Sequence, residues 1–563
     1  MHRISSWMRL MLVGALGAGL LIGAPAQAQA AFTVSTYSVP VTTPDTLGAL
    51  VSLDTDVYVP GGKVPPGGYP LLEIFHGGGS TKDNPYDAGH ARDFANDGYV
   101  VVMYSARGHG NSGGQVSVAG PAEIRDLFDV TAWALGHPDF HIDRSRIALS
   151  GYSQGGLHTN LGQVWAADPS IDPYGISFRA LEPGNTPDLV FNALVPNQVV
   201  KLSFGVGLIE TYLVGSSARI APVVDKWIAT TTADEPQGYG SGNLCDFSTH
   251  DTATSTMQAD LGWRSVGCQP GRLGLPWVWA QAFDDGLFPP DMAISMWNRA
   301  PNRSQHRLYL SMGGHAAPAA DAAVEQDRLA TQMRFLDAVM HGRSLPKPNV
   351  VYWTRDPAVA VPADSYAYPP GAWYRQTADT WPPAGVADTT YRFDAGTTYL
   401  SPLTEDERND PVAAAALSAT PLGGSLSSLP ATDLPGFIQS FRTPAFSSDT
   451  ELSGTPHANL AWTPAAPDSQ LVLELFDQAP DGTLTLFSRG VAGLRGAVPG
   501  LERTVRVDGN AFSIRLAAGH RVVAWVMGGN PAFYKPYPDS VGGVLKMGDA
   551  STLTLPLRPA PSR

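Results

Sequence analysis

The alternation of two residue patterns between Tyr69 and His341 constrains the fold of this chain more than any other feature. Short β-rich apolar runs recur there, and segments with a helical pattern separate them. This order is typical of a parallel sheet with helical crossover connections. Because helices cover both faces of such a sheet, its strands can be apolar almost throughout. The expected strands are residues 70–75, 99–106, 146–150, 277–283 and 307–313, and the expected helices are residues 123–135, the segment after residue 153, and residues 322–342.

Two regions depart from this alternation. Between about residues 201 and 271 the pattern gives way to Gly, Ser, Thr and a pair of cysteines, which indicates a cap inserted over the active edge of the sheet. After residue 345, a Pro-containing linker leads to short β runs separated by turns, and this pattern predicts an all-β sandwich or jelly roll. The expected organisation is an α/β domain over residues 31–345, which includes the cap, and a β domain over residues 346–563.

The first 30 residues have the pattern of a secretory signal peptide. Basic residues precede an apolar run over residues 10–22, and Ala-Gln-Ala cleavage sequences follow at residues 26–30. The mature chain would then begin near Ala31 and be secreted or periplasmic. A membrane anchor is the alternative, but the apolar run is shorter than the roughly 20 residues of a spanning helix. We therefore expect a mature form without a membrane span.

Cysteine content and charge narrow the compartment and the partners. Export implies an oxidising environment, in which Cys245 and Cys268 are expected to form a disulfide within the cap. Two buried free thiols are the alternative that the spacing leaves open. A net charge of -14 with 16% charged residues argues against nucleic acid and anionic membranes as partners, because both require clustered Lys and Arg. The charge is compatible with a small neutral or cationic substrate.

A candidate nucleophile lies in the segment Ile147–Leu161, IALSGYSQGGLHTNL. There an apolar strand leads through Gly-x-Ser-x-Gly, centred on Ser153, into a helix, which is the setting of a nucleophile elbow. A second match is centred on Ser112, but it lies in a Gly-rich loop without this strand and helix. The context favours Ser153. The alternative is a tight turn without chemistry, so the interpretation depends on a base, an acid and an oxyanion hole.

The base and the acid follow in the chain order of this fold, nucleophile, then acid, then base. Asp284 and Asp285 end one predicted strand, and His315 follows the next in a small-residue loop. These positions are carboxyl ends of strands, where open α/β sheets bind their ligands. His315 would take the proton of the Ser153 hydroxyl, and one aspartate would orient the imidazole. The residues alone leave both aspartates open for this role.

An oxyanion hole requires backbone N–H groups at a point where a carbonyl can approach closely, and glycine permits this approach. The loop FHGGGS follows the first strand of the alternation, as in esterases. The expected donors are the N–H groups of Gly78 and Gln154. The phenol of Tyr86, in the nearby DNPYD, is a weaker candidate, and a packed aromatic ring is the alternative for it.

Together these motifs resemble the α/β-hydrolases of the X-Pro dipeptidyl-peptidase and cocaine-esterase family. HGGGSTKDN, SARGHGNSGG, GYSQGG, FDDGLFPP and GGH occur in the order of that family, and PDGTLTLFSRG with PAFYKPYPDS resembles its C-terminal β domain. The resemblance implies an α/β-hydrolase fold followed by a jelly roll that packs against the catalytic sheet. In the family the acid stands before an x-x-Phe-Pro element, which selects Asp285.

Two departures from the family bear on the substrate. Gln154 stands where many members have tyrosine, and no acidic pair that would anchor a free peptide α-amine is recognisable. We therefore expect an exported serine hydrolase that cleaves carboxylic ester or amide bonds through an acyl-enzyme and needs no metal or other cofactor. An X-Pro dipeptidyl-peptidase is the first alternative. A non-catalytic binding protein is the second, and the intact set of Ser, Asp and His argues against it.

Overall fold

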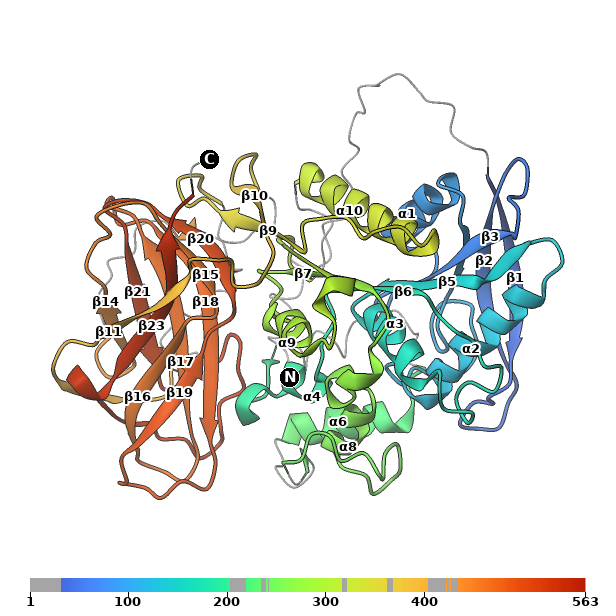
Figure 1. Ribbon diagram of the computed structural model, residues 1–563. Coiled ribbons are helices and arrows are strands. Elements are labelled where there is room, and N and C mark those ends of the chain that lie inside the picture. Colours follow the sequence, from blue (N-terminus) through green and yellow to red (C-terminus); the bar gives the residue numbers. More distant parts are fainter. Residues whose placement is uncertain are drawn as a thin grey trace.

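The computed structural model describes residues 32–202, 219–233, 239–240, 242–315, 321–361, 368–403, 422, 425–426 and 434–561. The expected signal peptide lies outside these residues, as do residues 203–218, 234–238 and 241 of the expected cap. Figure 1 shows an α/β body, coloured blue to yellow, beside a β body coloured orange to red. The predicted fold class, an α/β core with a C-terminal all-β domain, is thereby confirmed. None of the described helices is long and apolar enough to cross a membrane.

One mixed sheet forms the centre of the α/β body. Its strands lie in the order β1, β2, β4, β3, β5, β6, β7, β8, β9, β10. The run from β4 to β9 is parallel, and β1, β2 and β10 are added in antiparallel pairings at the edges. The strands are β1 (Phe32–Val41), β2 (Val51–Pro60), β3 (Tyr69–Phe75), β4 (Val100–Tyr104), β5 (Ile142–Tyr152), β6 (Ala180–Gly184), β7 (Trp277–Ala282), β8 (His306–Ser311), β9 (Val350–Arg355) and β10 (Trp373–Ala378).

Helices cover both faces of this sheet, which explains its apolar central strands. α2 and α3 pack on one face with alternate strand residues such as Leu149, and α1 and α10 pack on the other with Leu72 and Ile74 (Figure 1). Strands buried on both sides read as continuous apolar runs. The helices of the body are α1 (Pro85–Asn96), α2 (Pro121–Gly136), α3 (Gln154–Trp165), α9 (Asp291–Arg299) and α10 (Ala322–Met340).

Five strands of this sheet are not among those expected from the sequence, namely β1, β2, β6, β9 and β10. β1 and β2 form an antiparallel hairpin at one edge, and β6 is a short strand between β5 and β7. β9 lies beyond residue 345, the expected end of the first domain, yet it pairs in parallel with β8. The central sheet therefore continues past the Pro-containing segment.

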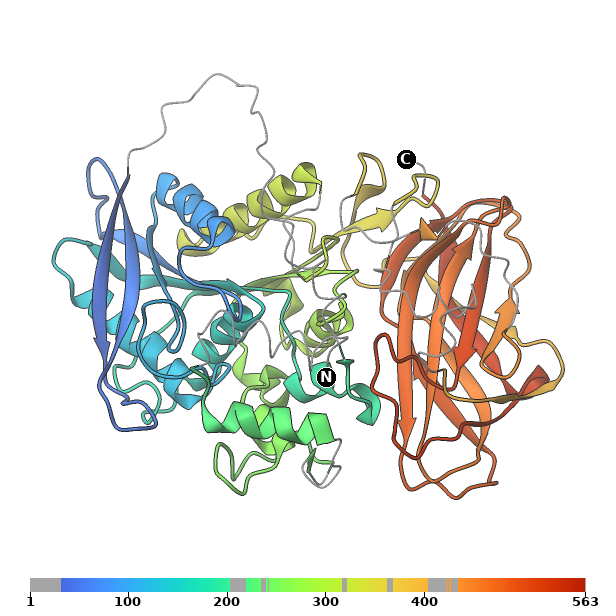
Figure 2. The ribbon, with the colours of Figure 1, turned by 180° about the vertical axis from the view of Figure 1, so that it is seen from behind.

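The C-terminal body is a sandwich of two antiparallel sheets (Figure 2). One sheet has the order β13, β18, β17, β21, β14. Its strands are β13 (Ser425–Leu426), β14 (Ile438–Arg442), β17 (Ser469–Gln478), β18 (Leu484–Leu494) and β21 (Arg521–Met527). The facing strands are β11 (Ala387–Arg392), β12 (Thr397–Leu400), β15 (Thr450–Gly454), β16 (His457–Pro464), β19 (Arg503–Asp508), β20 (Phe512–Leu516), β22 (Gly543–Lys546) and β23 (Thr552–Pro559).

The described part of the insertion between β6 and β7 contains α4 (Val190–Leu194), α6 (Pro222–Ala233) and α8 (Met257–Trp263). Cys245 and Cys268 form a disulfide there, with 5.1 Å between their Cα atoms, which confirms the expected bond. Arg264 donates hydrogen bonds to the carbonyls of Ser117 and Val118. These two residues belong to the loop that follows β4, so the insertion packs against the carboxyl end of that strand.

Candidate functional site

Ser153 stands at the turn between β5 and α3. Its backbone has φ 58° and ψ -121°, outside the region that a residue with a side chain usually adopts. A Cβ atom at Gly155 would lie 2.0 Å from the carbonyl oxygen of Phe75, so the helix can approach β3 this closely only with glycine there. The local sequence thus forces a sharp strand-to-helix turn with Ser153 at its tip.

His315 and Asp285 meet Ser153 at this edge of the sheet. The Nε2 atom of His315 lies 2.9 Å from Oγ of Ser153, and its Nδ1 atom lies 2.9 Å from Oδ2 of Asp285. An ionised carboxylate can only accept, so Nδ1 carries the proton and Nε2 accepts from the serine hydroxyl. The side chain of His315 is 21% exposed and that of Asp285 is fully buried. The three side chains thus form a hydrogen-bonded row that runs from the buried carboxylate of Asp285 to the accessible hydroxyl of Ser153.

The carboxylate of Asp285 is held in place by its own loop. Its Oδ1 atom accepts hydrogen bonds from the N–H groups of Leu287 and Phe288 at 2.8 and 2.9 Å. The ring of Phe288 also lies edge-on to the imidazole of His315, with 4.9 Å between ring centroids. Oδ2 therefore remains directed at His315, as the acid of a triad requires.

Asp284, the other aspartate of the pair, serves a different part of the site. Its carboxylate accepts from the N–H groups of Gly313 and Gly314 at 2.9 Å, and from the phenol of Tyr368. Burial raises the pKa of Asp284 to about 6, although these hydrogen bonds oppose the increase. Asp284 thus fixes the glycine turn that carries His315, a role that the sequence did not indicate.

The glycine loop after β3 passes close to Ser153, since a Cβ atom at Gly77 would lie 3.6 Å from the Cβ atom of Ser153. Two buried imidazoles hold this loop. His76 accepts from the N–H group of Ala106 at 2.9 Å, with its other nitrogen 2.7 Å from the carbonyl of Gly77. His109 accepts from the N–H group of Gly79 at 3.2 Å. Burial and repulsion from the neighbouring His109 ring lower the pKa of His76 to about 3. The His76 ring is therefore neutral.

Gly78, one expected oxyanion donor, is the central residue of this braced loop, and Gln154, the other, directly follows Ser153. The Gln154 side chain donates to Oε2 of the fully buried Glu123 at 2.9 Å. Burial alone would raise the pKa of Glu123, but hydrogen bonds from His158 and Ser117 lower it below its usual range. The carboxylate is therefore ionised and anchors the Gln154 side chain.

Tyr86 makes other contacts. Its hydroxyl donates to Oε1 of Glu325 at 2.8 Å, and the guanidinium of Arg328 donates to it. The phenol thus joins α1 to α10, which favours the packed aromatic ring over an oxyanion donor.

Ser112, the centre of the second Gly-x-Ser-x-Gly match, is fully buried. Its hydroxyl donates to the carbonyl of Ser105 at 2.6 Å and accepts from the N–H group of Asp54 at 2.9 Å. Both bonds are structural, so this match has no nucleophile. Among the described residues, no group of three or more His, Cys, Asp or Glu could hold a metal ion.

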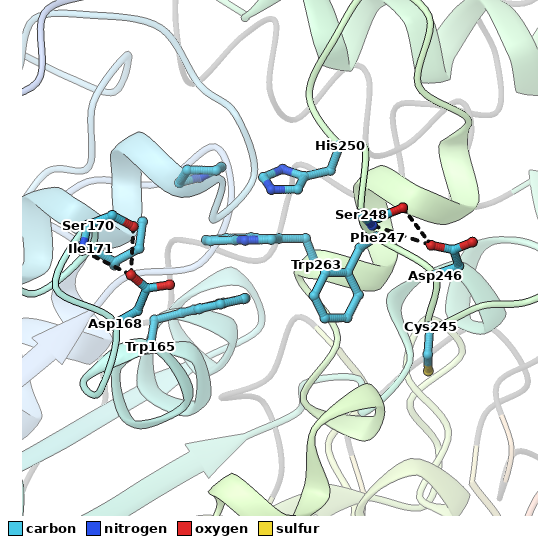
Figure 3. A pocket seen from close by; sticks show the side chains of 11 residues that line it. Trp165, Asp168, Ser170, Ile171, Cys245, Asp246, Phe247, Ser248, His250 and Trp263 are labelled. Carbon is cyan, nitrogen blue, oxygen red and sulfur yellow. Dashed lines mark hydrogen bonds between the residues drawn. The ribbon is translucent and has the colours of Figure 1, made fainter.

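Trp165 and Trp263 line a separate pocket of about 660 Å³ (Figure 3). Trp165 is the last residue of α3, and Ser153 precedes the first. The indoles of Trp165 and Trp263 stack within it at 4.6 Å, and His250 stacks on Trp263. The guanidinium of Arg272 lies over the Trp165 ring. This aromatic stack joins the insertion to the end of α3.

Comparisons with known proteins agree with this architecture. Residues 48–178 match the model of the X-Pro dipeptidyl-peptidase (S15 family), and residues 345–542 match the model of the X-Pro dipeptidyl-peptidase C-terminal non-catalytic domain. No match is found among curated proteins.

Several solved structures share the fold over most of the chain. A CocE/NonD family hydrolase from Staphylococcus aureus has a TM-score of 0.63 and 13% identity, with 93% of each chain covered. An aminopeptidase from a marine sediment Thaumarchaeota archaeon has a TM-score of 0.63 and 13% identity, with 96% of this chain and 99% of that chain covered. An α-amino acid ester hydrolase has a TM-score of 0.62 and 13% identity, with 97% of this chain and 100% of that chain covered.

The two family matches fall on different parts of the chain, one on the α/β body and one on the region that contains the β sandwich. The match to the catalytic family model precedes the match to the C-terminal domain model, as the corresponding motifs do along the sequence. The chain therefore matches the family models of both domains of X-Pro dipeptidyl-peptidases, shares its fold with CocE/NonD family hydrolases, and is a serine hydrolase.

Proposed function

We propose that this protein is an exported serine hydrolase that cleaves carboxylic ester or amide bonds through an acyl-enzyme on Ser153. One observation carries the proposal: the hydroxyl of Ser153, the imidazole of His315 and the carboxylate of Asp285 form a continuous hydrogen-bonded row. Serine is a weak nucleophile until an adjacent base removes its proton, and this row supplies that base.

In the first half of the reaction, Oγ of Ser153 attacks the carbonyl carbon while Nε2 of His315 takes the hydroxyl proton. The imidazolium that forms is stabilised by Asp285. The negative charge on the former carbonyl oxygen is accepted by the backbone N–H groups of Gly78 and Gln154. The bond to the leaving group then breaks, His315 returns the proton to that alcohol or amine, and the acyl group remains on Ser153.

In the second half, water replaces the leaving group. His315 takes a proton from the water as its oxygen attacks the acyl carbon, and the same N–H groups accept the charge. The bond to Oγ of Ser153 breaks, the proton passes to Oγ, and the carboxylic acid departs. The steps balance without a metal or other cofactor.

Export is part of the proposal. The residue pattern of positions 1–30 suggests a signal peptide, and the disulfide between Cys245 and Cys268 suits an oxidising compartment. N-terminal sequencing of the mature protein from the periplasm or medium tests it, with a start near Ala31 as the expected result. A cytoplasmic protein that retains Met1 would contradict it.

An X-Pro dipeptidyl-peptidase is the second candidate, and both family matches favour it because they carry that description. Such an enzyme must bind the free α-amine of a peptide. Asp284 and Asp285 are both engaged by the His315 loop and its neighbours, so neither supplies an anchor for that amine. We therefore place ester and amide hydrolysis first.

The experiment compares p-nitrophenyl acyl esters with Gly-Pro-p-nitroanilide on the purified protein. We expect turnover of the esters, and turnover of the peptide alone would reverse the order of the two candidates. Ser153→Ala should abolish fluorophosphonate labelling, while Ser112→Ala, the matched control at the second motif, should retain it per folded molecule. Labelling that survives Ser153→Ala would overturn the proposal in favour of a protein without catalysis at this site.

A further inference from the structure

Lys201 is a buried cation beside the acid of the site. Only 8% of its surface is exposed, and its Nζ atom donates to the carbonyls of Gly286 and Leu287 at 3.2 and 3.0 Å. These two residues directly follow Asp285. Burial lowers the pKa of Lys201 to about 8, and the nearby charge of Asp285 opposes this decrease. An ammonium therefore braces the turn that holds the carboxylate.

The loop of residues 530–537 in the β domain holds the backbone on either side of Lys201. The N–H group of Leu202 donates to the carbonyl of Phe533 at 2.8 Å, and the N–H group of Lys535 donates to the carbonyl of Val200 at 2.8 Å. Lys201 itself forms an antiparallel bridge with Tyr534. A strand-like segment of the α/β body is thus clamped by the β domain.

A third contact extends this clamp. The hydroxyl of Tyr537 donates to the carbonyl of Gln198 at 2.9 Å. The segment is fixed from the other side as well, because the N–H group of Lys201 donates to the carbonyl of Leu194 at 2.9 Å. The backbone at Lys201 is therefore held on both sides. From this fixed backbone, the side chain extends to the turn after β7.

We propose that Lys201 is a positioning residue through which the β domain holds Asp285 in line with His315. The connection runs from the loop of residues 530–537 to Lys201, and from its ammonium to the carbonyls of Gly286 and Leu287. The N–H groups of Leu287 and Phe288, in the same turn, bind Oδ1 of Asp285. This role rests on the proposed function of Ser153.

The charge of Lys201 also has an electrostatic effect. An ionised carboxylate in a buried position requires compensation, and the ammonium supplies it at the end of the row. Asp285 is the charged group whose field acts on the ammonium, and His315 is bound to that carboxylate. Tyr534 pairs with Lys201 through a backbone bridge in the β-domain loop. Burial raises the pKa of Tyr534 to about 12, so this phenol is neutral at working pH. Loss of the ammonium proton above pH 8 would weaken both the brace and the compensation.

The test measures kcat and KM on p-nitrophenyl acetate between pH 5 and 10. We expect wild-type kcat to fall above about pH 8. Lys201→Met should lower kcat at pH 7 by roughly 10- to 100-fold with little change in KM, and it should remove the alkaline decrease. Lys201→Gln, which keeps a hydrogen-bond donor without charge, should lose less kcat than Lys201→Met and should also lack the alkaline decrease.

The matched control is Lys226→Met. Nζ of Lys226 also donates to backbone carbonyls, those of Thr252 and Ser255, and pairs with the buried Asp260, but it does not contact the triad. Its loss should reduce stability and leave the pH profile of the folded fraction unchanged. A change at Lys226 equal to that at Lys201 would assign the effect to stability alone and overturn the proposal.

Two results separate this inference from the proposed function. Turnover that Ser153→Ala abolishes, together with a Lys201→Met variant that keeps wild-type kcat and the alkaline decrease, would overturn only the role of Lys201. Turnover that does not depend on Ser153 would overturn the proposed function. If the Lys201 variants fail to fold, the dependence of wild-type kcat on pH tests the proposal instead. A wild-type kcat that stays constant from pH 7 to 10 would overturn it.

Discussion

Asp284 and Asp285 are neighbours in the chain, yet they hold the catalytic loop at two different points. Asp285 binds the imidazole of His315, while Asp284 binds the N–H groups of Gly313 and Gly314 that precede it. One carboxylate orients the base and the other fixes the backbone that presents it. The two aspartates therefore have separate functions.

The two aspartates should differ in their effect on the rate. Asp285→Asn should lower kcat by about 10⁴-fold, because an amide at Oδ2 favours the wrong imidazole tautomer. Asp284→Asn keeps one acceptor oxygen, so we expect a loss on the order of 10-fold, as for one weakened hydrogen bond. Each kcat is measured on p-nitrophenyl acetate. Equal losses in the two variants would show that the assignment of the acid is wrong.

Substitution of Gly155 should prevent the elbow from closing. The Cβ atom of Gly155→Ala would overlap the carbonyl oxygen of Phe75, which belongs to the backbone and cannot move aside. We expect loss of fluorophosphonate labelling and a Tm lower by roughly 10 °C or more. Gly89→Ala, within α1 and with nothing near its added methyl group, is the control and should gain about 0.5–1 kcal/mol. A labelled, stable Gly155→Ala would contradict the packing described.

Stability should depend on pH through Glu182. This carboxyl on β6 is fully buried, and burial raises its pKa to about 8. The unfolded chain releases this proton at a pH near 4.5 and the folded chain only near 8, so the group's contribution to stability is complete below pH 4.5 and decreases up to pH 8. Glu182→Gln does not titrate. It should therefore become increasingly more stable than wild type across this range, by an amount on the order of a few kcal/mol.

Thermal unfolding of both proteins between pH 4.5 and 9 measures this difference. Glu502→Gln is the control, since its side chain is 49% exposed and pairs only with Lys546 at the surface. A difference in Tm between wild type and Glu182→Gln that stays constant with pH would rule out a neutral buried carboxyl.

The disulfide should stabilise the insertion rather than the triad. Cys245 and Cys268 are 23 positions apart, and a loop of this length gains about 3 kcal/mol from closure. Cys245→Ser/Cys268→Ser should increase proteolysis around residues 242–256 and keep fluorophosphonate labelling within a few-fold of wild type. Limited proteolysis with mass spectrometry measures the first effect. Loss of labelling with an intact insertion would assign the bond to the catalytic geometry instead.

Where the structure departs from the expected strands, local composition explains the difference. β1 is mostly exposed, and Thr and Ser separate its apolar residues, so no continuous apolar run marks it. β6 has the sequence ALEPG, and glutamate, proline and glycine all disfavour strands. It is a strand because β5 and β7 provide hydrogen bonds on both sides. At β6, tertiary pairing therefore overrides local preference.

The three residues of the hydrogen-bonded row could be predicted from the sequence because each lies in a local pattern that positions it. An apolar strand, two glycines and a helix place Ser153, and the ends of two further strands place Asp285 and His315 at the same edge. The choice between Asp284 and Asp285 required the family resemblance. The backbone after β7 turns so that consecutive carboxylates reach different partners, and residue order does not specify that direction.

The sequence by itself determined the order of the elements, the α/β class and the serine at the elbow, since these depend on hydrophobic period and on glycine at positions without space for a side chain. Only the tertiary structure decided that Asp284 holds the glycine turn, that His76 and His109 brace the glycine loop after β3, and that Lys201 reaches the turn after Asp285. Such contacts join residues 29 to 86 positions apart, and they exist only when side-chain conformers and two domains are in place.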